Sequence, residues 1–216
     1  MDSTSSDWFW PLVFGLCIAA VIAVVVVLRN SARGRALSQF AAKRGLRYTK
    51  RDDTLTAQYA GGMYAVHVVE GEKGGRRFVV FDSERSEETD EGSTSKPVTV
   101  VALRVGRRLP SLRCEMHKRA LFGGAAKGFR TGDQDFDKRF TVTTADAAFA
   151  SAVLTPSVRA ILLKEKCHQF VCHNDSVTLI TSGRYPLKGF DAAIERAERV
   201  VAEVPADAWQ RLPATD

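Results

Sequence analysis

Cysteine, histidine and the common catalytic signatures are all scarce in this 216-residue chain. It has four cysteines and four histidines, too few cysteines for a disulfide-stapled scaffold of this length. It contains no G-x-S-x-G, no H-E-x-x-H and no dinucleotide-binding glycine pattern. These absences remove the usual motif-based assignments to hydrolases, zinc proteases and nucleotide-dependent enzymes. We therefore predict no cofactor and expect a binding protein rather than an enzyme, with an enzyme of unrecognised site as an open alternative.

Charge is missing from one long segment near the N-terminus. Residues 8–28 read WFWPLVFGLCIAAVIAVVVVL, without a single charged or strongly polar side chain. A helix of 21 residues rises roughly 31 Å, which matches the thickness of the hydrocarbon core of a bilayer. The segment therefore predicts a transmembrane helix.

Acidic residues are missing from the segment that follows. Residues 29–51 contain eight Lys and Arg and no Asp or Glu, whereas residues 1–7 contain Asp2 and Asp7 and no base. Basic residues flank the cytoplasmic end of a span, so we expect the N-terminus outside and the rest of the chain in the cytoplasm, at the cell (inner) membrane. An acidic start and a long apolar run are the reverse of a cleavable signal peptide, which predicts an uncleaved anchor.

The formal net charge of +6 comes from this basic segment, because residues 52–216 carry equal numbers of acids and bases. A neutral domain does not predict nucleic-acid binding. We divide the chain into a tail over residues 1–7, a span over 8–28, a basic juxtamembrane helix or linker over 29–51, and a domain over 52–216.

The domain is predicted to be α+β, with a mainly antiparallel sheet covered by helices. Strand-forming runs rich in β-branched and aromatic side chains occupy residues 64–70, 77–82, 98–105, 111–118, 139–143, 169–173 and 177–181. Residues 111–118 are expected to pair with 98–105, and Asn174-Asp175 to turn between the last two strands. The acidic stretch 82–96 is expected to be a solvated loop.

Three helices are predicted between and after these strands. Thr144 is expected to cap the first, and Thr155 with Pro156 to open the second. The third spans residues 191–203, where apolar side chains recur every three to four positions before Pro205. A further helix over residues 31–44, closed by Gly45, carries a narrow apolar stripe.

Two arginine groups are candidate sites for anionic ligands. Arg29, Arg33 and Arg35 lie next to the span and could bind anionic lipid, or act only as a topology signal. The stretch 104–130 contains a second group that could form a phosphate or partner patch, or be neutralised by the acidic stretch 82–91. The members of this second group are Arg104, Arg107, Arg108 and Arg113.

Other patterns are weaker. Gly123–Gly128 lacks the spacing of a phosphate loop, and the alternating acids of residues 133–137 lack the glycine and glutamate of a calcium loop. The pairs Cys167-His168 and Cys172-His173 lie too close together for a zinc site, which predicts core cysteines and surface histidines and no metal site.

Two further groups of residues have a structural and a functional interpretation. Gly15, Ala19 and Ala23 recur at the four-residue spacing of a helix-dimer face, although such spacing is common in membrane helices. His67, Glu115 and His117 could converge in an unrecognised catalytic site, but each lies on a predicted strand. Exposed strand histidines are the default expectation.

The stretch from residue 135 to 163 contains Phe136-Asp137-x-Arg139-Phe140-x-Val142, then an alanine-rich segment and Leu154-Thr155-Pro156. This pattern resembles uncharacterised bacterial, and particularly actinobacterial, single-pass membrane proteins of unknown function. The resemblance implies an N-terminal span followed by a cytoplasmic domain, and it brings no activity or site residues. Within the motif, Asp137 and Arg139 are expected on one face of a strand.

We expect a membrane-tethered cytoplasmic interaction domain that binds a protein partner at the inner face of the membrane. An anionic-lipid or phosphate-ligand module is the first alternative, and an enzyme is the second. Nucleic acid is not an expected partner, and a homodimer is left open.

Overall fold

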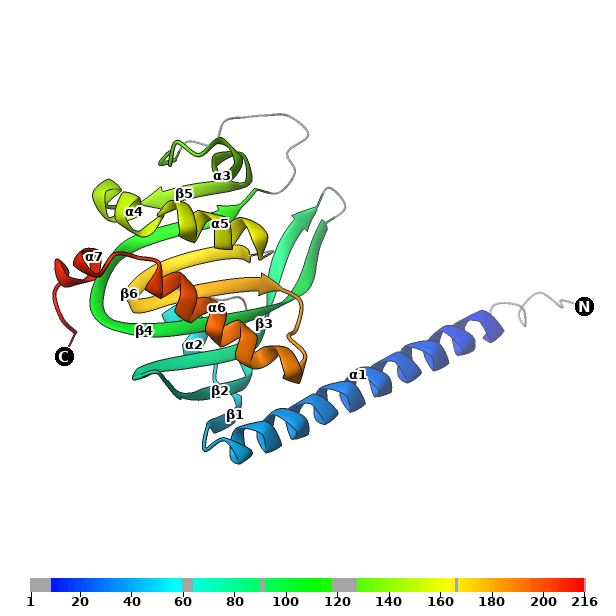
Figure 1. The fold of residues 1–216 in the computed structure, drawn as a ribbon. Coiled ribbons are helices and arrows are strands. Elements are labelled where there is room, and N and C mark those ends of the chain that lie inside the picture. Colours follow the sequence, from blue (N-terminus) through cyan, green and yellow to red (C-terminus); the bar gives the residue numbers. More distant parts are fainter. Residues whose placement is uncertain (1–8, 60–63, 90–91, 118–127, 166, 216) are drawn as a thin grey trace, which may run out of the picture.

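A computed structural model describes residues 9–59, 64–89, 92–117, 128–165 and 167–215. One long helix, α1 (Phe9–Lys43), precedes a folded body, and only its C-terminal part lies against that body (Figure 1). The helix ends where predicted, because Gly45 takes a left-handed φ of 66° and Leu46 N–H donates to the carbonyl of Ala41. The predicted helix over residues 31–44 is therefore continuous with the apolar segment.

Six strands form one sheet in which every pairing between described strands is antiparallel, as predicted. The path through the sheet runs β1-β2-β3-β4-β5, and β6 pairs with β4. The strands are β1 (Arg47–Arg51), β2 (Val66–Lys73), β3 (Arg76–Thr89), β4 (Gly92–Met116), β5 (Phe140–Thr144) and β6 (Cys167–Ser182).

The long strand β4 curves around β6, which itself doubles back near Asn174 (Figure 1). Residues 98–104 of β4 pair with residues 176–182 of β6, and residues 109–115 pair with 169–174. The predicted turn at Asn174 is confirmed by its φ of 53°. The predicted pairing of residues 98–105 with 111–118 is wrong, because the two arms of β6 lie between them. Gly106, with a φ of 66°, lies in the bend of β4.

Within the acidic stretch 82–96, the described residues 82–89 and 92–96 form two paired strands, a β-hairpin, and not the predicted loop. The ladder between β3 and β4 continues from Ser83 opposite Val98 to Thr89 opposite Gly92. Backbone hydrogen bonds extend two core strands into solvent, and side chains of Ser and Glu add cross-strand contacts such as Ser95 Oγ to Glu84 Oε2 at 2.8 Å. A high content of acidic residues is typical of coil, whereas the alternating Ser and Thr in part of this stretch are compatible with a strand.

Short polar side chains cap the N-termini of three of the described helices. Thr155 Oγ1 accepts from the backbone N–H of Val158, as predicted, but Asp146 and not Thr144 caps the preceding helix by accepting from Phe149 N–H. The helices after β4 are α3 (Gln134–Arg139), α4 (Ala147–Val153), α5 (Pro156–Lys164), the 3₁₀ turn η1 (Leu187–Gly189), α6 (Phe190–Ala202) and α7 (Ala206–Gln210). The predicted helix over 191–203 is thus confirmed as α6.

Helix α3 corrects the prediction for Asp137 and Arg139, which lie on this helix and not on a strand. Asp133 caps α3 by accepting from two backbone N–H groups, and Asp137 Oδ1 accepts from the backbone and hydroxyl of Thr131. Arg139 donates to the carbonyl of Leu163. These polar contacts stabilise the short helix. The alternation of apolar and polar residues, on which the strand prediction was based, gives no sign of them.

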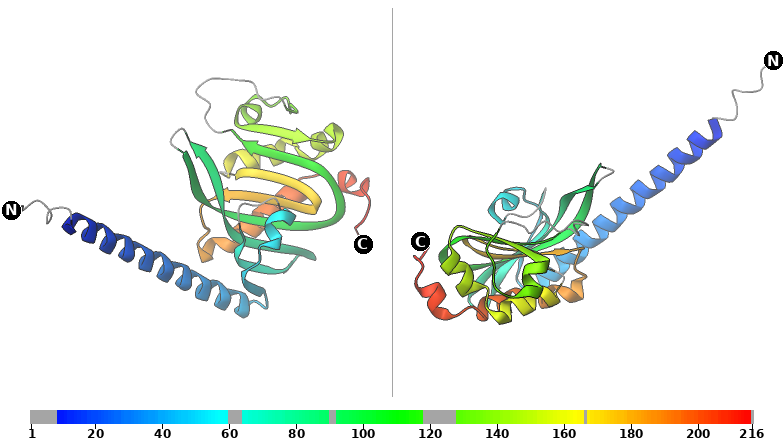
Figure 2. Two further views of the ribbon diagram at one scale, coloured as in Figure 1. Left: turned by 180° about the vertical axis from the view of Figure 1, so that it is seen from behind. Right: turned by 90° about the horizontal axis from the view of Figure 1, so that it is seen from above.

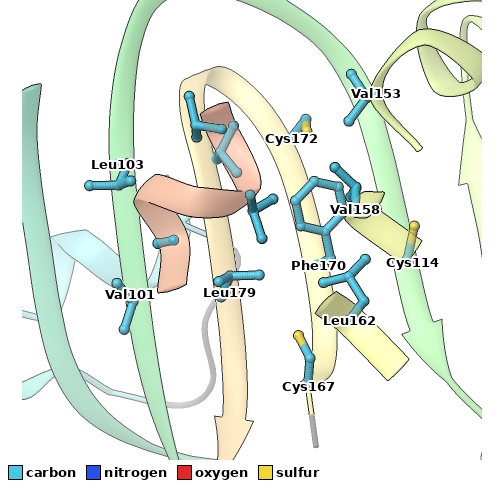
Figure 3. Close-up of a cluster of buried hydrophobic side chains, with 14 of the residues drawn as sticks. Val101, Leu103, Cys114, Val153, Val158, Leu162, Cys167, Phe170, Cys172 and Leu179 are labelled. Carbon is cyan, nitrogen blue, oxygen red and sulfur yellow. The ribbon is translucent and has the colours of Figure 1, made fainter. Parts of the chain in front are cut away.

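The sheet has a thickly and a thinly covered face (Figure 2). Helices α4, α5, α6 and α7 cover one face and enclose the larger core, where Phe136, Phe170 and Phe190 are fully buried. Part of this core is drawn in Figure 3. On the other face α2 (Thr54–Tyr59) contributes Leu55 and Tyr59 to a smaller apolar cluster.

The basic segment 29–51 packs on the body as part of the fold. Leu37 and Ala41 of α1 are fully buried in the larger core, and the Phe40 ring meets the Phe190 ring edge-on at 5.3 Å. β1 adds the edge strand next to β2. The narrow stripe on residues 31–44 therefore faces protein.

Within the described residues, no helix taken singly has the length and hydropathy needed to cross a membrane, and α4 with α5 meets that test only as a pair bent by 70°.

Candidate functional site at the foot of α1

A buried ion pair fixes α1 against the sheet. Arg33 of α1 donates from Nε to Asp82 Oδ2 at 2.5 Å and from Nη2 to Oδ1 at 2.9 Å. Its Nη1 donates to the carbonyl of Tyr185 at 2.8 Å. The Arg33 side chain is 16% exposed and that of Asp82 only 3%. All three contacts are made by one planar guanidinium, which restricts both the position and the rotation of the helix.

His67 and Tyr48 lie beside this pair. The His67 ring is buried, and its Nδ1 lies 3.0 Å from the Tyr48 hydroxyl. Burial lowers the pKa of His67, and the nearby Arg33 acts in the same direction, against an opposing effect of Asp82. His67 has a left-handed φ of 54° at a register shift in the β2–β3 ladder. The default expectation of an exposed histidine is therefore wrong at this position.

Gly34 allows the close approach of α1 to these rings. A Cβ at position 34 would lie 3.1 Å from both His67 Cε1 and the Tyr48 hydroxyl oxygen, tighter than ordinary van der Waals contact. A glycine inside a helix costs about 1 kcal/mol relative to alanine, so its presence here is explained by packing. The sequence signal that could have found the junction is this glycine, one residue after an arginine in a helical stretch.

A hollow of about 740 Å³ opens between α1 and strands β1 and β2. The described residues of its lining include three cationic side chains and no acidic one. Hydroxyl, amide and imidazole groups make up most of the rest. The lining residues are Asn30, Ser31, Gly34, Arg35, Ser38, Gln39, Tyr48, Lys50, Arg51, Val66 and His67.

Arg29, Arg33 and Arg35, the first candidate group for an anionic ligand, do not share one environment. Arg33 is engaged by Asp82, whereas Arg35 is exposed and lines the hollow. The side chain of Arg29 lies outside what the structure describes. Lys50 and Arg51, which the sequence interpretation did not single out, join Arg35 at the hollow because β1 runs beside α1.

The second arginine group is not gathered into one site by the contacts described. Arg104 pairs with Asp175 at 2.9 Å, and Arg107 donates to the carbonyl of Leu212 at 3.3 Å. The backbone of Arg108 donates to the carbonyl of Pro213, while Arg113 is exposed. These partners lie on β6 and in the C-terminal segment, not in the acidic hairpin. Residues 118–127, which include most of Gly123–Gly128, lie outside the described chain.

The histidines and acids of the catalytic hypothesis do not converge. His67 is on β2, near one edge of the sheet, whereas His117 follows β4 and its Nδ1 lies 3.1 Å from Thr141 Oγ1 on the opposite edge strand. Asp133 pairs with Arg159 at 3.1 Å, and Glu115 pairs with Arg85. Among the residues that can be described, no group of three or more potential metal ligands occurs.

The cysteines of the domain are core residues, as predicted. Cys114, Cys167 and Cys172 are buried in the larger core, as Figure 3 shows beside Phe170, and His173 is exposed. Burial raises the pKa of the Cys167 thiol to about 12 and raises the pKa of each of the other two. Burial therefore favours the protonated thiol at all three positions.

The predicted dimer face lies on the projecting part of α1. A Cβ added at Gly15 would have no heavy-atom neighbour within 4 Å, and Ala19 is exposed. The side chain of Ala23 lies outside the described set. Dimerisation through this face stays a prediction.

The fold defines the class: a mixed α/β domain with an antiparallel sheet, preceded by a long helix that docks through its C-terminal part. No family model and no curated protein matches the chain. Its fold is similar to the crystal structure of the mycobacterial trehalose monomycolate transport factor A, TtfA. The two chains are 17% identical over 85% of this chain and 97% of that one, with a TM-score of 0.51. At this identity the likeness establishes the fold, and the neighbour is actinobacterial like the proteins of the sequence resemblance.

Proposed function

We propose that the chain is a single-pass membrane protein whose cytoplasmic domain is held against the inner face of the membrane by α1. The observation that carries the proposal is the exposure of nine large apolar side chains on the projecting half of this helix, each 42–75% exposed. Water-exposed apolar surface of this extent on one helix is unfavourable unless lipid or protein covers it. The eight bases of residues 29–51 support an N-out orientation.

The domain acts, in this proposal, by binding a protein partner in or at the same membrane. The acidic β3–β4 hairpin and the apolar half of α1 project from the same side of the body (Figures 1 and 2). The hairpin would therefore face the membrane. Cytoplasmic loops of membrane proteins are rich in Lys and Arg, so an acidic hairpin at this height complements them and avoids anionic lipid.

The tether and the fold support an accessory role. Confinement by α1 raises the local concentration of the domain for a partner in the same membrane without any added contact. The structural neighbour is a transport factor by name. We extend to this chain the role of an accessory protein for a transport process at the membrane.

Photo-crosslinking in cells tests the partner proposal with the full-length chain. A photoreactive residue is placed at Ser86 or Ser93, which are exposed and whose hydroxyl oxygens lie 2.5 Å apart on neighbouring strands of the hairpin, and at exposed Ser157 on α5 as the control. We expect one reproducible membrane-fraction adduct from the two hairpin positions and none from position 157.

Charge reversal in the hairpin tests whether its acidity carries the contact. Replacing Glu84, Glu87 and Glu88 with Lys should abolish the adduct, because the basic surface of the partner would then meet like charge. No adduct from the wild-type hairpin, or an adduct unaffected by charge reversal, would contradict the proposal.

A further inference from the structure

We propose that the hollow between α1, β1 and β2 binds the phosphate of an anionic membrane lipid. The inference rests on the proposed anchoring of α1 for the source of the ligand, while the chemistry of the site comes from residues of the folded body. It concerns Arg35, Lys50 and His67, and it leaves the protein partner of the hairpin unchanged.

The charge of the hollow is positive and largely uncompensated. Arg51 is paired with Asp53 at 2.8 Å, whereas Arg35 and Lys50 have no ion pair with any residue that the structure describes. The nearby buried acid, Asp82, is already matched by Arg33. Two cations without a described ion-pair partner, one from a helix and one from a strand, thus line one concave surface, and the part of the lining that the structure describes contains no acid. That arrangement favours a ligand of negative charge.

His67 supplies a neutral donor at the floor of the hollow. More than nine-tenths of the residue is buried, yet it lines the hollow, and the hydrogen bond of its ring within the described residues is the one between Nδ1 and the Tyr48 hydroxyl. When the Tyr48 hydroxyl donates to Nδ1, the ring proton is on Nε2, which can then donate to an anion. The lowered pKa of His67 is consistent with this neutral tautomer. Ser31 and Ser38 add hydroxyl donors on the α1 side.

The position of the hollow selects a lipid over a dissolved anion. Ser31 and Arg35 follow Leu28, the last of the exposed apolar residues, by three and seven positions. At 1.5 Å per residue these side chains lie about 5–10 Å along the helix from the apolar part, which is the depth of lipid headgroups. Acyl chains of a lipid held there would run along the apolar half of α1.

The walls of the hollow are held rigidly enough to recognise a ligand. Arg33 and Asp82 fix α1 in front of β3, and Gly34 brings the helix into contact with His67 and Tyr48. The volume of about 740 Å³ lies within the range of small-molecule sites and accommodates a glycerophosphate headgroup.

Native mass spectrometry of the full-length chain in a neutral detergent tests the site. Phosphatidylglycerol is titrated against a background of phosphatidylcholine, and bound lipids per chain are counted. We expect one phosphatidylglycerol to be retained by the wild type. The double variant R35A/K50A should bind it about tenfold more weakly or worse, because two charged hydrogen-bond donors are lost. H67Q should weaken binding by a smaller factor.

The matched control is R76A/K138A, which removes the same charge from two exposed positions outside the lining. It should bind phosphatidylglycerol as the wild type does. Equal loss in both double variants would overturn the proposal, because binding would then follow overall charge. Absence of a preference for phosphatidylglycerol over phosphatidylcholine would also overturn it.

A second arm of the experiment uses inorganic phosphate in place of lipid. If phosphate occupies the hollow as tightly as phosphatidylglycerol, and R35A/K50A abolishes this, the site is for free phosphate and the lipid assignment is wrong. We expect phosphate to compete only weakly. The assay is carried out in detergent, so a chain that binds no lipid could still be anchored in the membrane by α1. Equally, a chain that is not anchored in cells would give the same count of bound lipid in this assay.

Discussion

The two halves of α1 belong to one uninterrupted helix and have opposite surroundings. In the N-terminal half Leu16 is 75% exposed and Phe14 70% exposed, although both are large and apolar. In the C-terminal half Leu37 and Ala41 are almost fully buried in the core of the domain, and Arg33 is held by Asp82. One helix is thus exposed in its N-terminal half, where no described residue of the body packs on it, and buried against the body in its C-terminal half.

The apolar residues follow a different pattern in each half of α1, and each pattern matches the surroundings of that half. Residues 12–28 are apolar on all sides, which is typical of a helix that lipid surrounds. Residues 31–44 show only a narrow stripe, and this stripe packs on the sheet and α6. We therefore expect substitutions in the first half to change membrane partition and those in the second half to change the stability of the domain.

The largest effect is expected from charges placed in the exposed half. Replacing Ile18 and Val21 with Lys should cost about 5–7 kcal/mol in membrane insertion, from about 2.5–3.5 kcal/mol for each charge near the middle of a span. The full-length variant should move from the carbonate-resistant membrane pellet to the supernatant, with unaltered denaturant unfolding of its domain. I18L/V21L is the control. Retention of the Lys variant in the pellet would contradict a membrane-embedded helix.

The second effect concerns the ion pair. Asp82→Ala leaves a buried guanidinium without its carboxylate, so unfolding free energy should fall by about 3–5 kcal/mol. Chemical denaturation of the full chain in mild detergent measures this loss. Asp53→Ala, which breaks the exposed pair with Arg51, should change stability by no more than about 0.5 kcal/mol. Equal effects of the two substitutions would mean that Arg33 does not dock the helix.

Truncation of the buried stripe should cost somewhat less. Leu37→Ala removes a side chain that is 1% exposed and should lower the unfolding free energy by about 3 kcal/mol. Leu28→Ala in the exposed half is the comparison and should leave domain unfolding unchanged. The same denaturation assay compares the two variants. A loss of stability in the Leu28→Ala variant would mean that both halves of α1 contribute to the folding of the domain, which would contradict this account.

The smallest effect is the pH dependence from His67. Its pKa in the folded chain is lowered by burial, so below the unfolded value of about 6.5 the unfolded chain binds the extra proton first. The stability that neutral His67 contributes is present above that pH and is lost as pH falls toward the folded pKa. Unfolding free energy should therefore fall more between pH 7.5 and 5.5 in the wild type than in H67Q. H173Q, at an exposed position, should keep the wild-type slope.

Local signals in the sequence were sufficient for much of the fold. The cap at Thr155, the apolar period of α6 and the turn at Asn174 each depend on a few neighbouring residues, and each prediction is confirmed. The path of β4 around β6 was not predictable, because its two halves pair with strand arms more than fifty residues away. The acidic hairpin was missed because backbone pairing continued from core strands outweighs side-chain polarity.

Only part of the candidate site could be predicted from the sequence. The charge pattern drew attention to Arg33 and Arg35, but Asp82 is 49 positions from Arg33, at the boundary between a predicted strand and a predicted loop. Lys50 and His67 come to the hollow through β1 and β2 packing beside α1, a tertiary arrangement with no sequence motif. Pairing across such distances is fixed by the fold and not by local propensity.

Protease accessibility in spheroplasts tests the anchoring and orientation most directly. The full-length chain carries a C-terminal tag and is expressed in bacterial cells whose outer layers are then removed. We predict that the tagged domain stays intact in added protease and remains in the membrane fraction until detergent opens the membrane, and that it is digested only then. Digestion of the domain in sealed spheroplasts, or its recovery as a soluble species, would contradict a cytoplasmic domain held at the membrane by α1.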